Sequence, residues 1–284
     1  MLKQRVITAV VLLAILLPAL FWRTPHPFIA VTLIAIAAGA WEFARLNGSG
    51  SVGSVALGLV CAALCAAAWA LGWVDRTLPL LWGVVGVAWV VLGAMLLRLG
   101  VTGWPRVPRA LRLAGGLAAL CLAWLAVAQA RVTGINFLLS VLVLVWVADI
   151  GAYFAGRTFG LKFTRGKLAP SISPGKSWEG VWGGMLGVLL LAAGWIAGDR
   201  HWDAQVPSLY SRLAATGWWL VVAGVAFLSA MSVVGDLVES LVKRSAGAKD
   251  SSGLLPGHGG VLDRVDALLP ALPLAMLLAT WATR

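Results

Sequence analysis

The sequence has few charged residues and no long polar segment that would suit a soluble domain. Only 12% of its 284 residues are Asp, Glu, Lys or Arg, whereas 61% are hydrophobic. This balance excludes an ordinary soluble globular domain and indicates an integral membrane protein. The sequence also has only three cysteines, at 61, 65 and 121, in apolar stretches and without a CxxC spacing. We expect them to pack as small residues, not to bind a metal or form disulfides.

Nine stretches are apolar and long enough to span a bilayer as helices, which need about 20 residues each. They cover residues 6–22, 28–44, 52–73, 78–97, 110–130, 135–155, 178–198, 218–242 and 265–283. Because backbone groups in hydrocarbon must be hydrogen-bonded within their own segment, these stretches predict an all-α, polytopic membrane protein. The first stretch follows Lys3 and Arg5 as a signal peptide would, but it ends in the bulky residues 20–22. We therefore expect it to remain as a helix.

The positive charges divide unevenly if nine spans begin with a cytoplasmic N-terminus. Of the 22 Lys and Arg residues, six fall on the outer side, namely Arg23, Arg76, Arg131, Arg200, Arg212 and Arg284. This asymmetry follows the positive-inside tendency and predicts that the N-terminus is cytoplasmic. Anionic lipid headgroups are sufficient to explain the net charge of +11, so we expect no nucleic-acid partner.

Acidic residues are scarce, and their positions are informative. In the same topology, all but three of the 11 acids lie at or near cytoplasmic helix ends, the exceptions being Asp75, Asp199 and Asp203. Asp149 and Asp236 lie about 9 Å inside their helices, at 1.5 Å per residue. A carboxylate at that depth needs a cation, a hydrogen-bonding cluster or water.

Two groups of acids have helical spacing. Asp236, Glu239 and Ser240 share one helical face, and Asp263 and Asp266 repeat the three-residue spacing where the last helix begins. Oxygen ligands of this kind suit Mg²⁺ better than zinc, for which His and Cys ligands are missing.

Two structural alternatives stay open for these acids. Asp236 could form an ion pair with Lys243 or Arg244 on the same helix. Asp263 and Asp266 could complement the positive end of a helix dipole.

Two cytoplasmic segments have the composition of phosphate-binding loops. Residues 156–178 combine glycines, hydroxyls and five cations, although an ordinary positive-inside loop would look similar. They do not form a P-loop, because Pro170 stands where that motif needs Gly. Residues 240–266 mix cations, acids and glycines, which suits a triphosphate with its metal. In this segment His258 could donate to a phosphate or brace the Gly-rich turn.

The second segment resembles the signature of the phosphatidate cytidylyltransferases, also called CDP-diacylglycerol synthases. The matching residues are Ser240, Lys243, Arg244, Lys249, Asp250, Pro256, His258, Gly259, Gly260, Asp263, Arg264 and Asp266. Residues 149–157 and 173–180 are also similar to family segments, with Ser177 where the family usually has Thr. The resemblance covers about the C-terminal half. It implies a scaffold of helices in residues 1–130 and a catalytic region in residues 131–284.

The resemblance implies transfer of CMP from CTP to phosphatidic acid, with Mg²⁺ and possibly a second cation, in the bacterial inner membrane with the active site facing the cytoplasm. The implied metal ligands are Asp236, Ser240 and Asp263. The implied catalytic residues are Asp236, Asp263, Lys243, Arg244 and Asp266. The implied substrate-binding residues are Lys176, Ser177, Lys249, His258, Arg264 and Asp149. The lipid phosphate is already ionised near neutral pH, so no general base is required.

Two other functions are compatible with parts of this pattern. A CTP-dependent kinase of polyprenyl or phytyl alcohols would need a base for the hydroxyl. An ion or solute transporter would also use intramembrane acids, but transporters place them near the midplane in corresponding positions of two repeats, and no repeat is evident here. The sequence leaves the oligomeric state open, including a homodimer.

Overall fold

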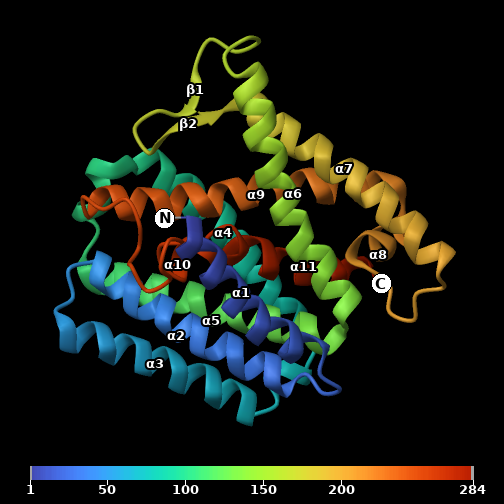
Figure 1. Ribbon diagram of the computed structural model, residues 1–284, viewed down its shortest axis with the longest axis horizontal. Coiled ribbons are helices and arrows are strands. Elements are labelled where there is room, and N and C mark those ends of the chain that lie inside the picture. Colours follow the sequence, from blue (N-terminus) through green and yellow to red (C-terminus); the bar gives the residue numbers. More distant parts are fainter. Residues whose placement is uncertain (1, 283–284) are drawn as a thin grey trace. The chain divides into compact units, whose positions relative to one another are not determined.

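The computed structural model of the protein describes residues 2–282 and consists mainly of long helices (Figure 1). Within this range, nine helical segments are long and apolar enough to cross a membrane. The corresponding helices are α1 (Leu2–Phe21), α2 (His26–Leu46), α3 (Ser51–Ala70), α4 (Pro79–Gly103), α5 (Arg109–Thr133), α6 (Ile135–Phe159), α7 (Trp178–His201), α9 (Trp218–Ser245) and α11 (Leu268–Ala282). The all-α polytopic fold and its nine spans are therefore confirmed. The last residue of the ninth predicted stretch, 283, and Arg284 lie outside the described residues, and the cytoplasmic N-terminus stays a prediction.

The helices belong to two compact units. The first unit contains α1, α2, α3, α5, the end of α9 from Glu239 onward, and the short helix α10 (Leu262–Val265). The second contains α4 as far as Gly100, α6, α7, α9 as far as Val238, and α11. Gly100 has φ +70° and ψ −177°, a left-handed backbone conformation that favours glycine and interrupts α4 at this boundary. The functional division at residue 130 stays a prediction.

In the first unit, α2 packs against α3 and α5. Gly58 of α3 lies so close to α2 that a Cβ there would be 3.0 Å from the carbonyl oxygen of Ala37. The thiols fill space between α3 and α5: Cys61 and Cys65 are buried, and the Sγ of Cys61 is 3.6 Å from that of Cys121. The cysteines thus lie at a helix contact, where small side chains are suited to close packing.

The second unit contains two short elements that the sequence did not predict. One is an antiparallel hairpin of β1 (Lys167–Ala169) and β2 (Ser173–Ser177), which leads directly into α7. The other is α8 (Leu209–Thr216), which packs against α7 and α11. The Ser177 hydroxyl accepts a hydrogen bond from the Gly180 N–H at 3.1 Å, so this residue is the N-cap of α7.

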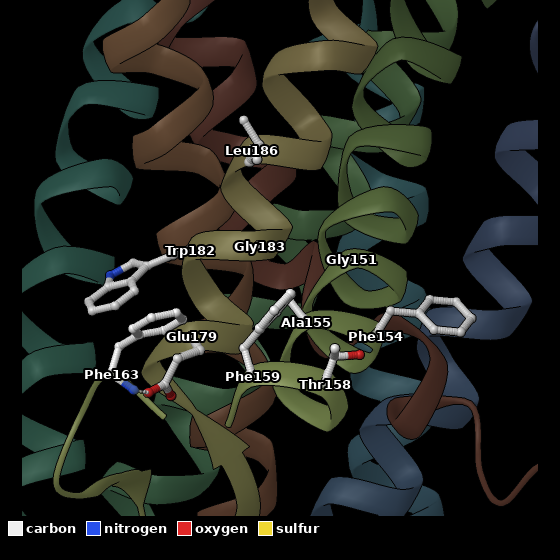
Figure 2. Close-up of a pocket in the computed structure, with 10 residues that line it drawn as sticks. All are labelled: Gly151, Phe154, Ala155, Thr158, Phe159, Phe163, Glu179, Trp182, Gly183 and Leu186. Carbon is white, nitrogen blue, oxygen red and sulfur yellow. Dashed lines mark hydrogen bonds between the residues drawn. The ribbon is translucent and has the colours of Figure 1, made fainter. Parts of the chain in front are cut away.

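The loop between α6 and the hairpin is held by Glu179 in the first turn of α7 (Figure 2). Its Oε1 accepts hydrogen bonds from the Phe163 N–H at 3.1 Å, the Thr164 N–H at 2.8 Å and the Thr164 hydroxyl at 2.8 Å. Since α6 and α7 also approach closely, with Gly184 against the Ala148 carbonyl, the end of α7 fixes where this basic loop leaves the helices.

Candidate active site

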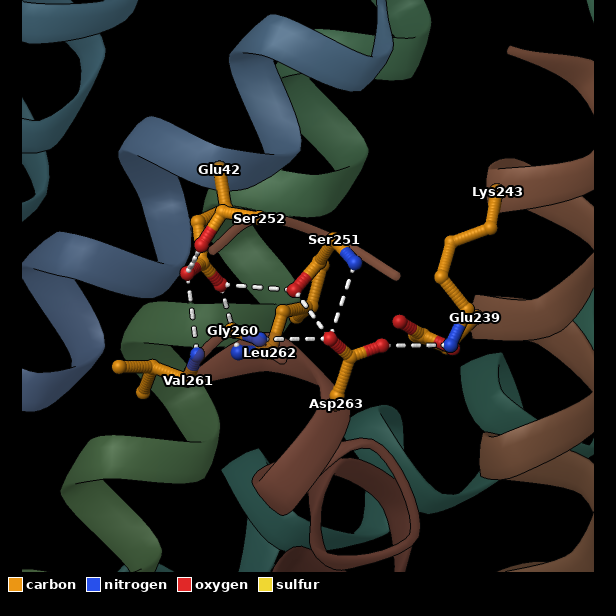
Figure 3. A network of polar contacts seen from close by, with 9 residues as sticks. All are labelled: Glu42, Glu239, Lys243, Ser251, Ser252, Gly260, Val261, Leu262 and Asp263. Carbon is orange, nitrogen blue, oxygen red and sulfur yellow. Dashed lines mark hydrogen bonds and ion pairs between the residues drawn. The ribbon is translucent and has the colours of Figure 1, made fainter. Parts of the chain in front are cut away.

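A cluster of acids surrounds Lys243 in the first unit (Figure 3). The Nζ of Lys243 is 2.6 Å from Oε2 of Glu239, one turn earlier on α9, and 2.6 Å from Oδ1 of Asp263 on α10. The three side chains are 13%, 2% and 5% exposed, respectively. Asp266 lies within electrostatic range of Glu239. One ammonium group therefore lies among three carboxylates, and the cluster carries excess negative charge.

The second oxygen of Asp263 holds the Gly-rich turn. Oδ2 accepts hydrogen bonds from the Ser251 N–H at 2.9 Å, the Ser251 hydroxyl at 2.9 Å and the Gly260 N–H at 2.7 Å. Gly259 has φ +80°, and a Cβ there would be 2.6 Å from this same oxygen. Glycine is required because the chain must approach the carboxylate this closely.

Glu42 is part of this network, although the sequence did not indicate it as a site residue. It lies on α2 and is fully buried. Oε1 accepts from the Ser252 hydroxyl at 2.5 Å and the Val261 N–H at 3.0 Å, and Oε2 accepts from the Ser251 hydroxyl at 3.1 Å and the Leu262 N–H at 2.7 Å. Figure 3 shows the carboxylates of Glu42 and Asp263 on the two sides of Ser251. Glu42 therefore ties α2 to the loop that carries the signature.

A second cluster lies in the second unit. The Nζ of Lys176, on β2, is 2.6 Å from Oδ2 of Asp236 on α9, and their side chains are 24% and 29% exposed. Asp149 on α6 lies within electrostatic range of both residues. This cluster also has one carboxylate in excess, and it is open enough for a substrate to reach it.

The two structural alternatives for the acids have separate outcomes. The ion pair of Asp236 is with Lys176, from another element, while Lys243 pairs with Glu239 and Asp263. Asp263 does lie in the first turn of α10 and accepts the Gly260 N–H, as the helix-terminus alternative requires. The ion pair of Asp263 with Lys243 is an additional contact that an acid at a helix terminus does not require.

The other predicted site residues are placed as follows. Arg244, Lys249 and Arg264 are exposed cations, and Ser240 and Asp266 are half-buried. The His258 N–H donates to the Leu255 carbonyl at 2.8 Å, so its backbone closes the Gly-rich turn.

Ser177 caps α7, as described above, and the roles of all these side chains toward substrate stay predictions. Asp236 belongs to the second unit, whereas Ser240 and Asp263 belong to the first.

The donor set of the two clusters suits a hard divalent cation. Every ligand that they offer is a carboxylate or hydroxyl oxygen, which Mg²⁺ prefers. Among the described residues, five carboxylates (Asp149, Asp236, Glu239, Asp263 and Asp266) accompany two ammonium groups in these clusters. A cation bound in either cluster would offset the excess negative charge of that cluster. Cationic and hydroxyl groups on the same elements can hold phosphate oxygens, so the arrangement suits the transfer of a nucleotidyl or phosphoryl group.

Comparisons with known proteins agree with this chemistry. A model of the cytidylyltransferase family matches residues 3–281. A protein of Pseudomonas aeruginosa named phosphatidate cytidylyltransferase is 40% identical over 288 residues, which cover 99% of this chain and 98% of that protein. Proteins of the same name from Haemophilus influenzae and Brucella suis are 51% and 48% identical over 140 and 145 residues. Those two matches cover 49% and 51% of this chain and 44% and 46% of the relatives.

Proposed function

Because the chain belongs to the cytidylyltransferase family, we propose that it transfers CMP from CTP to phosphatidic acid, giving CDP-diacylglycerol and pyrophosphate. The observation that carries the proposal is the match to the Pseudomonas aeruginosa protein along almost the full length of both chains. It is supported by the two clusters, because the first contains Lys243 and Asp263 of the signature and the second contains Lys176 of the similar segment 173–180, each together with carboxylates.

In this reaction an ionised oxygen of the lipid phosphate attacks the α-phosphorus of CTP. A new oxygen–phosphorus bond forms while the bond from the α-phosphorus to the bridging oxygen breaks, and that oxygen leaves with pyrophosphate. Lys176, Lys243, Arg244 and Arg264 hold and orient the phosphates of the two substrates, which are otherwise repelled by each other. The lipid phosphate needs no proton removed, so His258 has no role as a general base.

The proposal includes a Mg²⁺ ion held by Asp236, Ser240 and Asp263, with the supporting charges of Asp149 and Asp266; a second cation is left open. When bound, it neutralises charge on the reacting phosphates and on the leaving pyrophosphate. Asp263 can bind this ion only if its carboxylate exchanges the Lys243 ammonium group for the ion. The ammonium group is then free to bind a phosphate oxygen. The buried acid–cation pair is thus a resting arrangement in this proposal.

We also propose that the protein lies in the bacterial inner membrane with both clusters at the cytoplasmic face. The uneven distribution of Lys and Arg supports this orientation. CTP and lipid would then reach the site from the cytoplasm and from the bilayer, respectively. A homodimer stays a possibility that no contact of this chain addresses.

The position of the label that enters the lipid tests this reaction. Membranes containing the protein are incubated with phosphatidic acid and CTP labelled on the α- or the γ-phosphate. We expect label from the α-position in the lipid and label from the γ-position in pyrophosphate. Lipid labelled only from the γ-position would instead identify a lipid kinase. Uptake of a solute into proteoliposomes without CTP turnover would identify a transporter.

Exchanging the partners of the Lys176–Asp236 ion pair distinguishes a functional pair from a structural one. Lys176→Ala is expected to raise the KM for CTP or lipid about tenfold to a hundredfold, as for a hydrogen bond to a charged group. In Lys176→Asp/Asp236→Lys the ion pair is kept with its direction reversed. We expect this double variant to unfold at the wild-type temperature but to have no transferase activity. Restored activity would mean that the pair is only structural.

A further inference from the structure

An apolar groove lies between α6 and α7, at the end next to the hairpin (Figure 2). Its volume is about 490 Å³, and its wall includes Phe154, Phe159, Phe163, Glu179, Trp182 and Leu186. A volume of this size is within the range of ordinary ligand sites. Apart from Phe163, these residues belong to membrane-spanning helices. The groove therefore lies at the hairpin end of two helices that are long and apolar enough to span a membrane.

The apolar side chains of this wall are exposed. Phe163 is 73% exposed and Leu186 is 59% exposed. The rings of Phe159 and Phe163 lie 6.2 Å apart, and Figure 2 shows them with Trp182 along the groove. Because these apolar surfaces are exposed among the described residues, a partner from the membrane is the expected neighbour.

The segment that contributes Phe159 and Phe163 to the groove is cationic. Arg157, Lys162, Arg165 and Lys167 are all exposed, and residues 156–177 contain no acid. The Nζ of Lys162 lies 5.5 Å from the centre of the Phe159 ring, which is part of the apolar wall. Glu179, the carboxylate among the described lining residues, is hydrogen-bonded to the loop at Phe163 and Thr164. This segment thus offers several exposed cations to an anionic headgroup.

A strained residue lies in the same segment. Leu161, in the turn after α6 and two residues before Phe163, has φ +63°, which a bulky side chain rarely adopts, and it is 50% exposed. Its side chain adds to the exposed apolar surface of this segment.

We propose that this groove binds an acyl chain of phosphatidic acid while Arg157, Lys162, Arg165 and Lys167 bind its phosphate, so that the groove receives the lipid substrate beside the hairpin that carries Lys176. This inference rests on the proposed function for the identity of the lipid. A nucleobase is a poorer occupant, because among the described lining residues only Thr158, Glu179 and Trp182 have side chains that form hydrogen bonds, and Glu179 already holds the loop.

Photo-cross-linking tests the site without requiring turnover. Phe163 is replaced by p-benzoylphenylalanine, and the protein is placed in bilayers containing either phosphatidic acid or phosphatidylcholine at the same mole fraction, without CTP. We expect about ten times more adduct with phosphatidic acid, since each cation near a membrane surface contributes measurably to binding an anionic lipid. The same replacement at Leu190, which is exposed on α7 outside the groove, should show no preference.

Two double variants, each lacking two exposed cations, test whether the cations of residues 157–167 are needed to bind the lipid substrate. Arg165→Gln/Lys167→Gln should remove the preference at position 163 and raise the KM for phosphatidic acid about tenfold, with the KM for CTP unchanged. Arg98→Gln/Arg106→Gln, which removes two other exposed cations, should change neither quantity.

Two results would overturn the inference. Equal adducts with the two lipids at position 163 would mean that the groove is ordinary lipid-facing surface. Loss of adducts when CTP is added without Mg²⁺ would mean that the groove holds the nucleotide. A chain that cross-links phosphatidic acid selectively but transfers no CMP would contradict the proposed function alone.

Discussion

Asp263→Asn is expected to lower the rate of CDP-diacylglycerol formation about a thousandfold. The substitution removes the charge that pairs with Lys243 at 2.6 Å and that would hold the cation, while the shape of the side chain is kept. Removing one group that stabilises charge in a transition state costs about 2.7–4 kcal/mol. About 4 kcal/mol corresponds to three orders of magnitude in rate. The measurement is the initial rate with labelled CTP over a range of Mg²⁺ concentrations.

Two further variants separate lost chemistry from lost folding. Asp203→Asn makes the same change at an exposed residue with φ +47°, a conformation that Asn tolerates, so activity should be unchanged. Ser251→Ala removes the hydroxyl that donates to Asp263 at 2.9 Å but keeps the carboxylate, and we expect less than a tenfold loss. If Asp263→Asn is folded and retains wild-type activity, Asp263 is not a metal ligand or a catalytic residue.

The membrane-spanning helices could be predicted because the bilayer imposes a strong physical requirement. Each segment must be apolar over about 20 residues and must satisfy its own backbone, so hydropathy alone reveals it. The predicted stretch 218–242 corresponds to α9, and 135–155 corresponds to α6, with helix ends that extend a few residues further. The hairpin at Lys167–Ser177 lacked such a signal, since its two strands have only three and five residues.

The candidate site could be predicted only where its residues are close in sequence. Glu239 and Lys243 are four residues apart on one helix and form an ion pair, whereas the pair considered from the sequence was that of Asp236 with Lys243 or Arg244. The contact of Lys176 with Asp236 joins residues 60 positions apart, and no local pattern encodes it. Lys243 was predicted to hold a phosphate, but the structure shows it between two carboxylates, so its phosphate role requires the exchange described above.

The sequence indicates that the Glu42 carboxylate needs partners, but it does not identify them. It is the one acid in the apolar stretch 28–44, and a lone carboxylate in such a stretch needs partners. Those partners are about 210 positions away, in the loop at Ser251 and Ser252. Position alone therefore indicates that Glu42 is bonded, but not to which segment.

Glu42→Gln is expected to release the signature loop from α2. The carboxylate accepts four hydrogen bonds, from two hydroxyls and from the backbone N–H groups of Val261 and Leu262. A Gln side chain has one acceptor oxygen and an NH₂ group that also donates, so at least one buried N–H loses its acceptor. Each such group costs about 1–3 kcal/mol. We expect the free energy of unfolding to fall by about 2–4 kcal/mol.

Hydrogen exchange and transferase activity, both measured on the purified Glu42→Gln protein, report the effect of this change. Amides between 250 and 262 should exchange at least tenfold faster in Glu42→Gln, while those in the middle of α7 should be unaffected. Transferase activity should fall more than tenfold, because the loop that Glu42 holds at Val261 and Leu262 also carries the Gly260 N–H that donates to Asp263. Ser252→Ala, which removes one neutral donor to Glu42, should have a much smaller effect on both quantities. If exchange in the loop is unchanged while activity is lost, Glu42 does not act by holding the loop, and its carboxylate must contact the substrates or the cation directly.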